Sequence, residues 1–129
     1  MMSIRLIKIA VIYLAIGMSL GLYMGSVQDF LFRSVHAHIN LLGWASIALA
    51  ALVFHMFPEL VRTRLATIWF WGYNIATPIS LVLLAFEVSG RAWAGPLLGI
   101  SMTVVWAMGL VFAANVLINL RGSQAVPAR

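Results

Sequence analysis

The sequence predicts an all-α membrane protein, with four transmembrane helices in an antiparallel up-down bundle. Two observations lead to this class. Hydrophobic residues make up 64% of the chain and charged residues only 9%, whereas a soluble domain carries about 25% charged residues. Four apolar stretches are also long enough to cross roughly 30 Å of bilayer hydrocarbon, which takes about 20 helical residues. The eight basic and three acidic residues cannot cover the surface of a water-soluble domain of 129 residues.

The four apolar stretches are separated by short connectors that hold most of the charged residues. We expect one domain over residues 1–129, with helices over 4–24, 34–57, 66–86 and 93–120 and a disordered polar tail at 121–129. Connectors this short place each helix antiparallel to the one before it.

Basic residues are distributed unevenly between the two ends of the bundle. The end that holds the N-terminus carries Arg5, Lys8, Arg62, Arg64, Arg121 and Arg129, and the other end carries Arg33 and Arg91. Because basic residues concentrate on the cytoplasmic side of membrane proteins, this split predicts that both termini are cytoplasmic. The basic residues stand singly at the ends of spans, so the net charge of +5 indicates membrane lipids as partners and no nucleic acid.

Several small, aromatic and amide side chains suggest how the spans pack. Glycines at four-residue spacing form a groove for close helix contact, although glycine is also generally frequent in membrane helices; these are Gly17, Gly21 and Gly25, and then Gly95 and Gly99. Tryptophans near span ends are expected to anchor at the membrane interface, namely Trp69, Trp71 and Trp93. Three asparagines are expected to make interhelical hydrogen bonds, namely Asn40, Asn74 and Asn115.

The three histidines all fall in the second span, and two of them lie about one turn inside it. An ionisable residue within a membrane helix is costly and usually functional, so His36 and His38 are candidate cofactor ligands. Each helical residue turns by about 100°, which points these two side chains roughly 200° apart. They therefore cannot chelate one metal in the way an i, i+4 pair does, and each must serve a different site.

The remaining residues narrow the choice of cofactor. The chain has no cysteine, and imidazole suits haem iron, copper or zinc. Haem fits best, because helical bundles commonly hold cofactors between facing apolar helices. Arg33 and Arg91 lie at the level of the histidine pair and are candidate partners for haem propionates. His55 lies about 25 Å further along the helix, where we expect it to make interfacial hydrogen bonds.

The stretch His36-Ala-His38-Ile-Asn, with Gly43-Trp44 following, resembles the haem-ligating helices of the haem–copper oxidase superfamily. In the catalytic subunit of these cytochrome oxidases and nitric oxide reductases, the two members of a His-x-His pair ligate two different haems. The resemblance gives that role to His36 and His38 and places Trp44 at the cofactor. The segment from Gly109 to Asn115 also resembles the last helix of that subunit.

The chain departs from this family in size and in its copper ligands. The family subunit has twelve helices in three arcs of four, so this chain matches one arc. Its third span contains no histidine, so the copper centre cannot be carried over; we assign no catalytic residue and expect no terminal oxidase activity. A homotrimer would restore the three arcs, because heterologous contacts commonly close into rings. Each haem b would then be held by His36 of one copy and His38 of its neighbour.

The leading interpretation is a haem b-binding protein of a bacterial inner membrane that transfers electrons or handles a gas such as NO or O₂. Quinol or a c-type cytochrome is the expected electron partner. Copper binding or copper handling is an alternative, because seven methionines and three histidines offer soft and imidazole ligands; the methionines, however, are scattered. A cofactor-free subunit of a respiratory complex is the third interpretation, and it leaves His36 and His38 without a role.

Overall fold

The computed structural model describes residues 1–120, and all secondary structure in that range is helical. Four stretches are long and apolar enough to cross a membrane, namely Met2–Val27, Arg33–Met56, Arg64–Val88 and Ala94–Asn119. Their ends lie within three residues of the predicted ones, and the all-α membrane class is confirmed. The polar tail expected at 121–129 lies outside the described residues.

The second span is built from three helical segments rather than one. Helix α1 (Met2–Val27) forms the first span, and α2 (Arg33–His38), the π-helix η1 (Ile39–Ala45) and α3 (Ser46–Met56) form the second. The one-turn helix α4 (Pro58–Val61) then leads to α5 (Arg64–Val88) and α6 (Ala94–Asn119).

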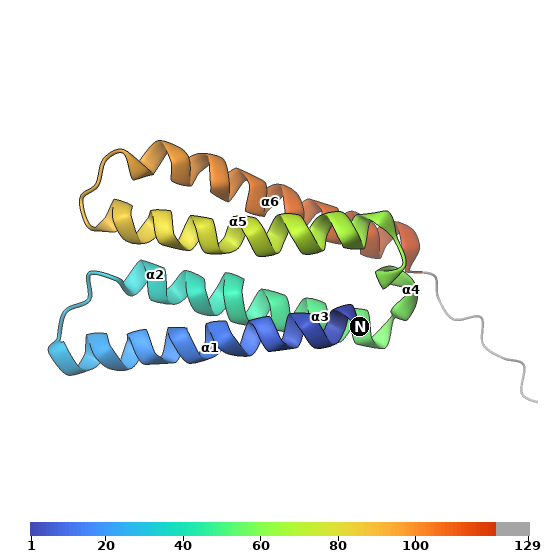
Figure 1. The fold of residues 1–129 in the computed structure, drawn as a ribbon, viewed down its shortest axis with the longest axis horizontal. Coiled ribbons are helices and arrows are strands. Elements are labelled where there is room, and N and C mark those ends of the chain that lie inside the picture. Colours follow the sequence, from blue (N-terminus) through green and yellow to red (C-terminus); the bar gives the residue numbers. More distant parts are fainter. Residues whose placement is uncertain (121–129) are drawn as a thin grey trace, which may run out of the picture.

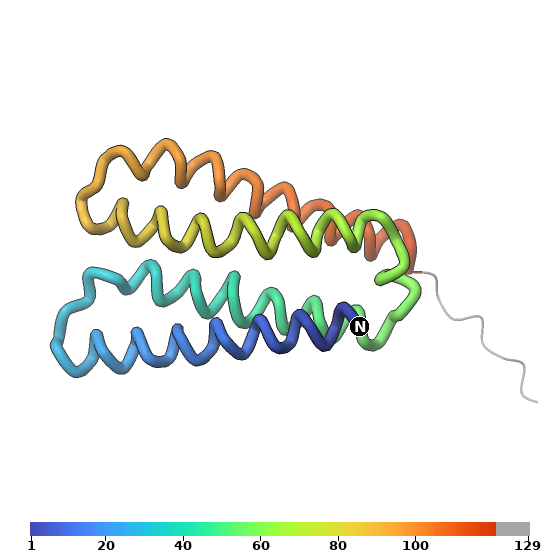
Figure 2. The backbone as a smooth tube through the Cα atoms, in the orientation of Figure 1, coloured from blue at the N-terminus to red at the C-terminus, as the bar shows by residue number. Residues whose placement is uncertain are grey.

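The helices are arranged as two hairpins that lie side by side (Figure 1). Helix α1 packs along α2, η1 and α3, and α5 packs along α6. Between the hairpins, α2 and η1 contact α5, as the backbone trace in Figure 2 shows. The N-terminus, α4 and the end of α6 lie at one end of the bundle, and the α1–α2 and α5–α6 connections lie at the other (Figure 1).

Local sequence explains where these helices begin and end. Helix α1 stops at Gln28, which adopts a left-handed backbone (φ 54°), and Gly90 (φ 81°) lies in the turn after α5. Glycine takes up such a φ without a steric cost, which explains Gly90 but not Gln28. Helix α5 begins after Thr63, whose Oγ1 accepts a hydrogen bond from the Ala66 amide at 3.1 Å and so caps the first turn.

An aromatic cluster fills the core where the two hairpins meet. The ring centroids of Phe54 on α3 and Trp69 on α5 lie 5.6 Å apart, and Phe112 on α6 lies 5.2 Å from Trp69. Trp69 is only 2% exposed, so our expectation that it anchors at the membrane interface is wrong. Trp71 and Trp93 do lie on the outer surface, at 60% and 55% exposure.

Asn115 ties α6 to the connection between the hairpins. Its fully buried side chain accepts hydrogen bonds from Thr63 Oγ1 at 2.9 Å and Asn119 Nδ2 at 3.0 Å, and it donates to the Leu60 carbonyl oxygen at 3.1 Å. This confirms the interhelical role expected of Asn115. Because all of these partners lie in or beside α4 or on α6, the connection belongs structurally to the second hairpin.

Asn74 behaves differently. Its Nδ2 donates to the Phe70 carbonyl oxygen of its own helix at 2.7 Å, so the interhelical bond expected of it is not formed within the described chain. Asn74 Oδ1 and Thr77 Oγ1 are buried without a hydrogen-bond partner among residues 1–120. Pro78 lies inside the same helix and has no N–H for the Asn74 carbonyl, so this stretch concentrates unsatisfied polar groups.

Candidate functional site

The candidate site is built around α2, where His36 faces α1. The His36 Nδ1 atom lies 2.8 Å from the Gly17 carbonyl oxygen. A carbonyl oxygen only accepts hydrogen bonds, so the proton of a neutral His36 ring is assigned to Nδ1. Asn40 Nδ2 also lies 3.4 Å from this nitrogen, but it has a better acceptor in the His36 carbonyl oxygen at 2.9 Å. The lone pair of His36 is therefore on Nε2.

His38 is assigned the same neutral tautomer from a different contact. Its Nδ1 lies 2.8 Å from the carbonyl oxygen of Ser34, one turn earlier on the same helix. The same argument leaves the lone pair of His38 on Nε2. Because α2 is a regular α-helix through His38, the two rings project on sides of the helix that differ by about 200°. Both side chains are half-buried.

Glycines on α1 make room for the polar side chains of the second span. A Cβ at Gly17 would lie 2.6 Å from Asn40 Nδ2, and one at Gly21 would lie 2.8 Å from His36 Cε1. Only glycine lets these side chains reach α1, so the expected packing groove is confirmed at both positions. It does not extend to Gly25, where a Cβ would meet nothing within 4 Å.

The glycine pair expected to form a groove on α6 lacks such contacts with the part of the chain that the structure describes. A Cβ at Gly99 would meet nothing within 4 Å, and one at Gly95 would only approach Glu87 Cγ at 3.9 Å.

The π-helix η1 follows the histidines directly. Such segments are rare and are often found at functional sites. The turns of a π-helix are wider than those of an α-helix, and its backbone hydrogen bonds join residues five apart. Side chains also donate hydrogen bonds to carbonyl oxygens in and beside η1. Asn40 Nδ2 donates to the His36 oxygen at 2.9 Å, Ser46 Oγ to the Leu41 oxygen at 2.7 Å, and Tyr73 Oη to the Leu42 oxygen at 3.1 Å.

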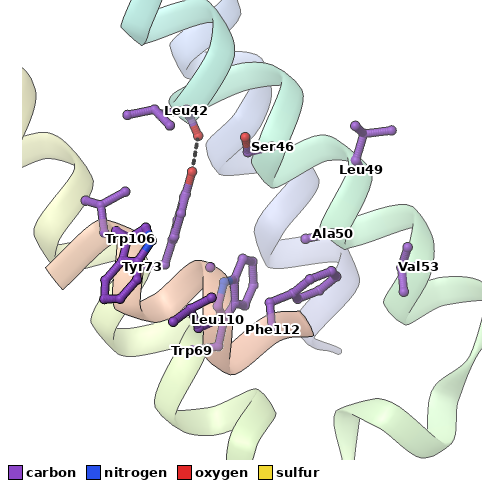
Figure 3. Close-up of a pocket in the computed structure, with 12 residues that line it drawn as sticks. Leu42, Ser46, Leu49, Ala50, Val53, Trp69, Tyr73, Trp106, Leu110 and Phe112 are labelled. Carbon is purple, nitrogen blue, oxygen red and sulfur yellow. Dashed lines mark hydrogen bonds between the residues drawn. The ribbon is translucent and has the colours of Figure 1, made fainter. Parts of the chain in front are cut away.

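An apolar cavity of about 480 Å³ lies beside η1, between the two hairpins (Figure 3). This volume is within the range of small-molecule sites, which are typically about 300–1,000 Å³. Its lining consists of Leu42, Ser46, Leu49, Ala50, Val53, Trp69, Tyr73, Val105, Trp106, Gly109, Leu110 and Phe112. Tyr73 and Ser46 contribute the hydroxyl groups, and Figure 3 shows the Tyr73 hydroxyl pointing to the Leu42 carbonyl oxygen. His36 and His38 do not line this cavity.

The other predicted site residues are spread along the bundle. Arg33 is the first residue of α2 and Arg91 lies in the α5–α6 connection, so both are at the histidine end, and both are exposed. Trp44 lies in η1 and packs against the main hydrophobic core. His55 is exposed in the last turn of α3, at the opposite end of the second span from His36. Among residues 1–120, no three His, Cys, Asp or Glu side chains group as a metal site.

Sequence reasoning missed the π-helix and the cavity beside it. One signal was present: Gly43 is the close-packed glycine of η1, where a Cβ would overlap the ring of Tyr13 on α1. Tyr73 gave no comparable signal, because a tyrosine within an apolar span is equally typical of the core.

Comparison of the chain with models of protein families, with curated proteins and with solved structures finds no match. The fold is that of an all-α membrane bundle, and its candidate site is a histidine pair beside a π-helix. The resemblance to the haem–copper oxidase superfamily rests on the sequence residues that carry it.

Proposed function

We propose that this chain is a haem b-binding integral membrane protein that transfers electrons or handles a diatomic gas. One observation carries the proposal. His36 and His38 each have Nδ1 at 2.8 Å from a backbone carbonyl oxygen, which leaves the Nε2 lone pair of each ring without a hydrogen bond from residues 1–120 and able to bind iron. Ligating histidines usually donate the other ring N–H in this way, and the bond fixes the tautomer and the ring orientation.

The residues that would hold the haem come from more than one copy of the chain. Because His36 and His38 project on different sides of α2, we assign them to two haems, each completed by the other histidine of a neighbouring copy in a homotrimer. Arg33 and Arg91, at the same end of the bundle, would face the propionates. A haem held by His36 and His38 would supply a one-electron couple, and two imidazole ligands would favour electron transfer over gas binding.

The lining of the cavity between the hairpins favours a lipid-soluble electron donor as its occupant. Its lining is almost wholly apolar and aromatic, which suits a quinol better than the charged surface of a c-type cytochrome. The hydroxyl protons of Tyr73 and Ser46 are already donated to backbone carbonyls, so their oxygens are left to accept. A quinol, which carries hydroxyl donors, fits this better than a quinone.

The test is the visible spectrum and haem content of the purified protein, oxidised and reduced, from haem-replete cells. We expect a six-coordinate b-type spectrum, and the variants His36→Ala and His38→Ala should each lose most of the haem. His55→Ala is the matched control and should keep it, because His55 lies at the other end of the span.

The outcomes separate the three interpretations. A colourless preparation with stoichiometric copper would replace haem by copper binding. A colourless, metal-free preparation would indicate a subunit without a cofactor. Loss of haem in His55→Ala but not in His38→Ala would overturn the assignment of ligands.

A further inference from the structure

A crevice between α1 and α5 lies near the end of the bundle opposite the histidines. It measures about 460 Å³, and its lining includes Arg5 and Lys8 on α1 and Phe70, Trp71 and Asn74 on α5. The crevice lies between the first hairpin and the second, and none of the residues proposed to hold haem lines it. Nothing in the haem proposal requires it.

Arg5 and Lys8 are the two cations of a groove whose other lining residues are apolar or aromatic except for Asn74. Arg5 and Lys8 are three residues apart on α1, a spacing that brings side chains to the same helix face, and both are exposed. Glu59 is the only acidic residue at this end of the described chain, and it does not line the crevice. Among residues 1–120, no acidic side chain lining the crevice therefore balances the two positive charges.

The apolar part of the crevice continues from these cations toward the membrane interior. Trp71 is 60% exposed and Ile75 is 53% exposed, so both present apolar surface to lipid. An indole at this level is typical of the aromatic belt, where ring and headgroup meet.

We propose that this crevice binds one anionic phospholipid, with its phosphate between Arg5 and Lys8 and an acyl chain along Ile9, Phe70 and Ile75. Charge complementarity selects the occupant. A zwitterionic lipid offers no net negative charge to the two cations, and a free phosphate ion has no chain to fill the apolar groove. Basic pockets between transmembrane helices bind anionic headgroups for the same reason.

The experiment uses tryptophan fluorescence of the full chain in a neutral detergent, titrated with phosphatidylglycerol brominated on its acyl chains. Bromine quenches nearby indoles, and subtraction of the Trp71→Phe variant isolates the signal at the crevice from the other tryptophans. We expect saturable quenching by this lipid. In R5Q/K8Q the apparent dissociation constant should rise roughly tenfold, because each cation contributes about fivefold and salt screens part of the effect.

The matched control is R62Q/R64Q, which removes the same charge at the same end of the bundle but outside the crevice. It should change the constant less than twofold. Equal weakening in the two double variants would show attraction by overall charge and overturn the site. Equal quenching by brominated phosphatidylcholine, or displacement of the lipid by inorganic phosphate alone, would also overturn it.

Discussion

At the scale of single residues, the polar chemistry of the second span depends on glycine in the first. Gly17 and Gly21 place backbone rather than side chains against Asn40 and His36. The carbonyl oxygen of Gly17 thereby comes within 2.8 Å of His36 Nδ1. The glycine spacing on α1 thus sets the orientation of the His36 ring, and the histidine and glycine motifs act together.

Gly21→Ala should disturb His36 without unfolding the bundle. The new methyl group would sit 2.8 Å from His36 Cε1, and forcing an extra methyl into a packed site typically costs about 1–3 kcal/mol. We expect a shifted haem spectrum or lower haem content, measured per mole of protein. Gly25→Ala is the control, because its methyl group meets nothing within 4 Å. Equal spectra for both variants would mean that His36 is not a ligand held in this position.

At the scale of elements, the second span shows what a sequence pattern can and cannot predict. Its length and apolar composition predicted a continuous helix, and the ends are nearly right. The seven-residue π-helix inside it was not predicted, and one of its carbonyl oxygens, that of Leu42, accepts a hydrogen bond from Tyr73 on α5. The composition of the second span alone cannot reveal a contact with another helix. The burial of Trp69 was missed for the same reason, since its partners are on α3 and α6.

Replacing Asn115 should lower the free energy of unfolding, because its side chain joins α6 to α4 and Thr63. Asn115→Ala removes three hydrogen bonds at a fully buried position, and we expect a loss of roughly 2 kcal/mol, at about 0.6 kcal/mol for each bond in a membrane protein. Asn119→Ala removes only the bond to Asn115 Oδ1 and should cost about 0.6 kcal/mol. Reversible unfolding in mixed micelles measures both; equal effects would mean that the Leu60 and Thr63 contacts contribute nothing.

At the scale of the whole molecule, the distribution of charge is strongly asymmetric. Among residues 1–120, the end of the bundle that holds the N-terminus carries four basic residues and one acidic residue, namely Arg5, Lys8, Arg62, Arg64 and Glu59. At the other end, Arg33 and Arg91 are balanced by Asp29 and Glu87. The tail arginines used in the sequence argument, Arg121 and Arg129, lie outside the described residues, and the bias persists without them.

This asymmetry predicts the orientation in the membrane, with the N-terminus in the cytoplasm. The chain has no native cysteine, so single cysteines report without background. Ser26→Cys and Ser89→Cys, at the histidine end, should react with a membrane-impermeant maleimide in intact cells, and Glu59→Cys should react only after lysis. Labelling of Glu59→Cys alone in intact cells would reverse the topology.

The proposed trimer makes a stoichiometric prediction for the assembled protein. Native mass and haem content measured on one sample in mild detergent should give three chains and three haems. Co-expressed His36→Ala and His38→Ala chains should recover part of the haem, because a mixed ring can contain one intact pair of ligands. A monomer with fully six-coordinate haem would contradict the shared site.

The position of α4 has a consequence for how the chain can be divided. Because Leu60 and Thr63 are bonded to Asn115, the seam between the hairpins falls before Pro58, at Phe57, and not in the middle of the connecting segment. The first piece then holds the packed first and second spans, and the second piece holds α5 packed on α6. We expect each hairpin to insert into the membrane as one unit. We expect a chain cut at Phe57 to give two fragments that reassemble. A cut after Thr63 would instead separate Leu60 and Thr63 from Asn115, and Thr63 from the first turn of α5 that it caps.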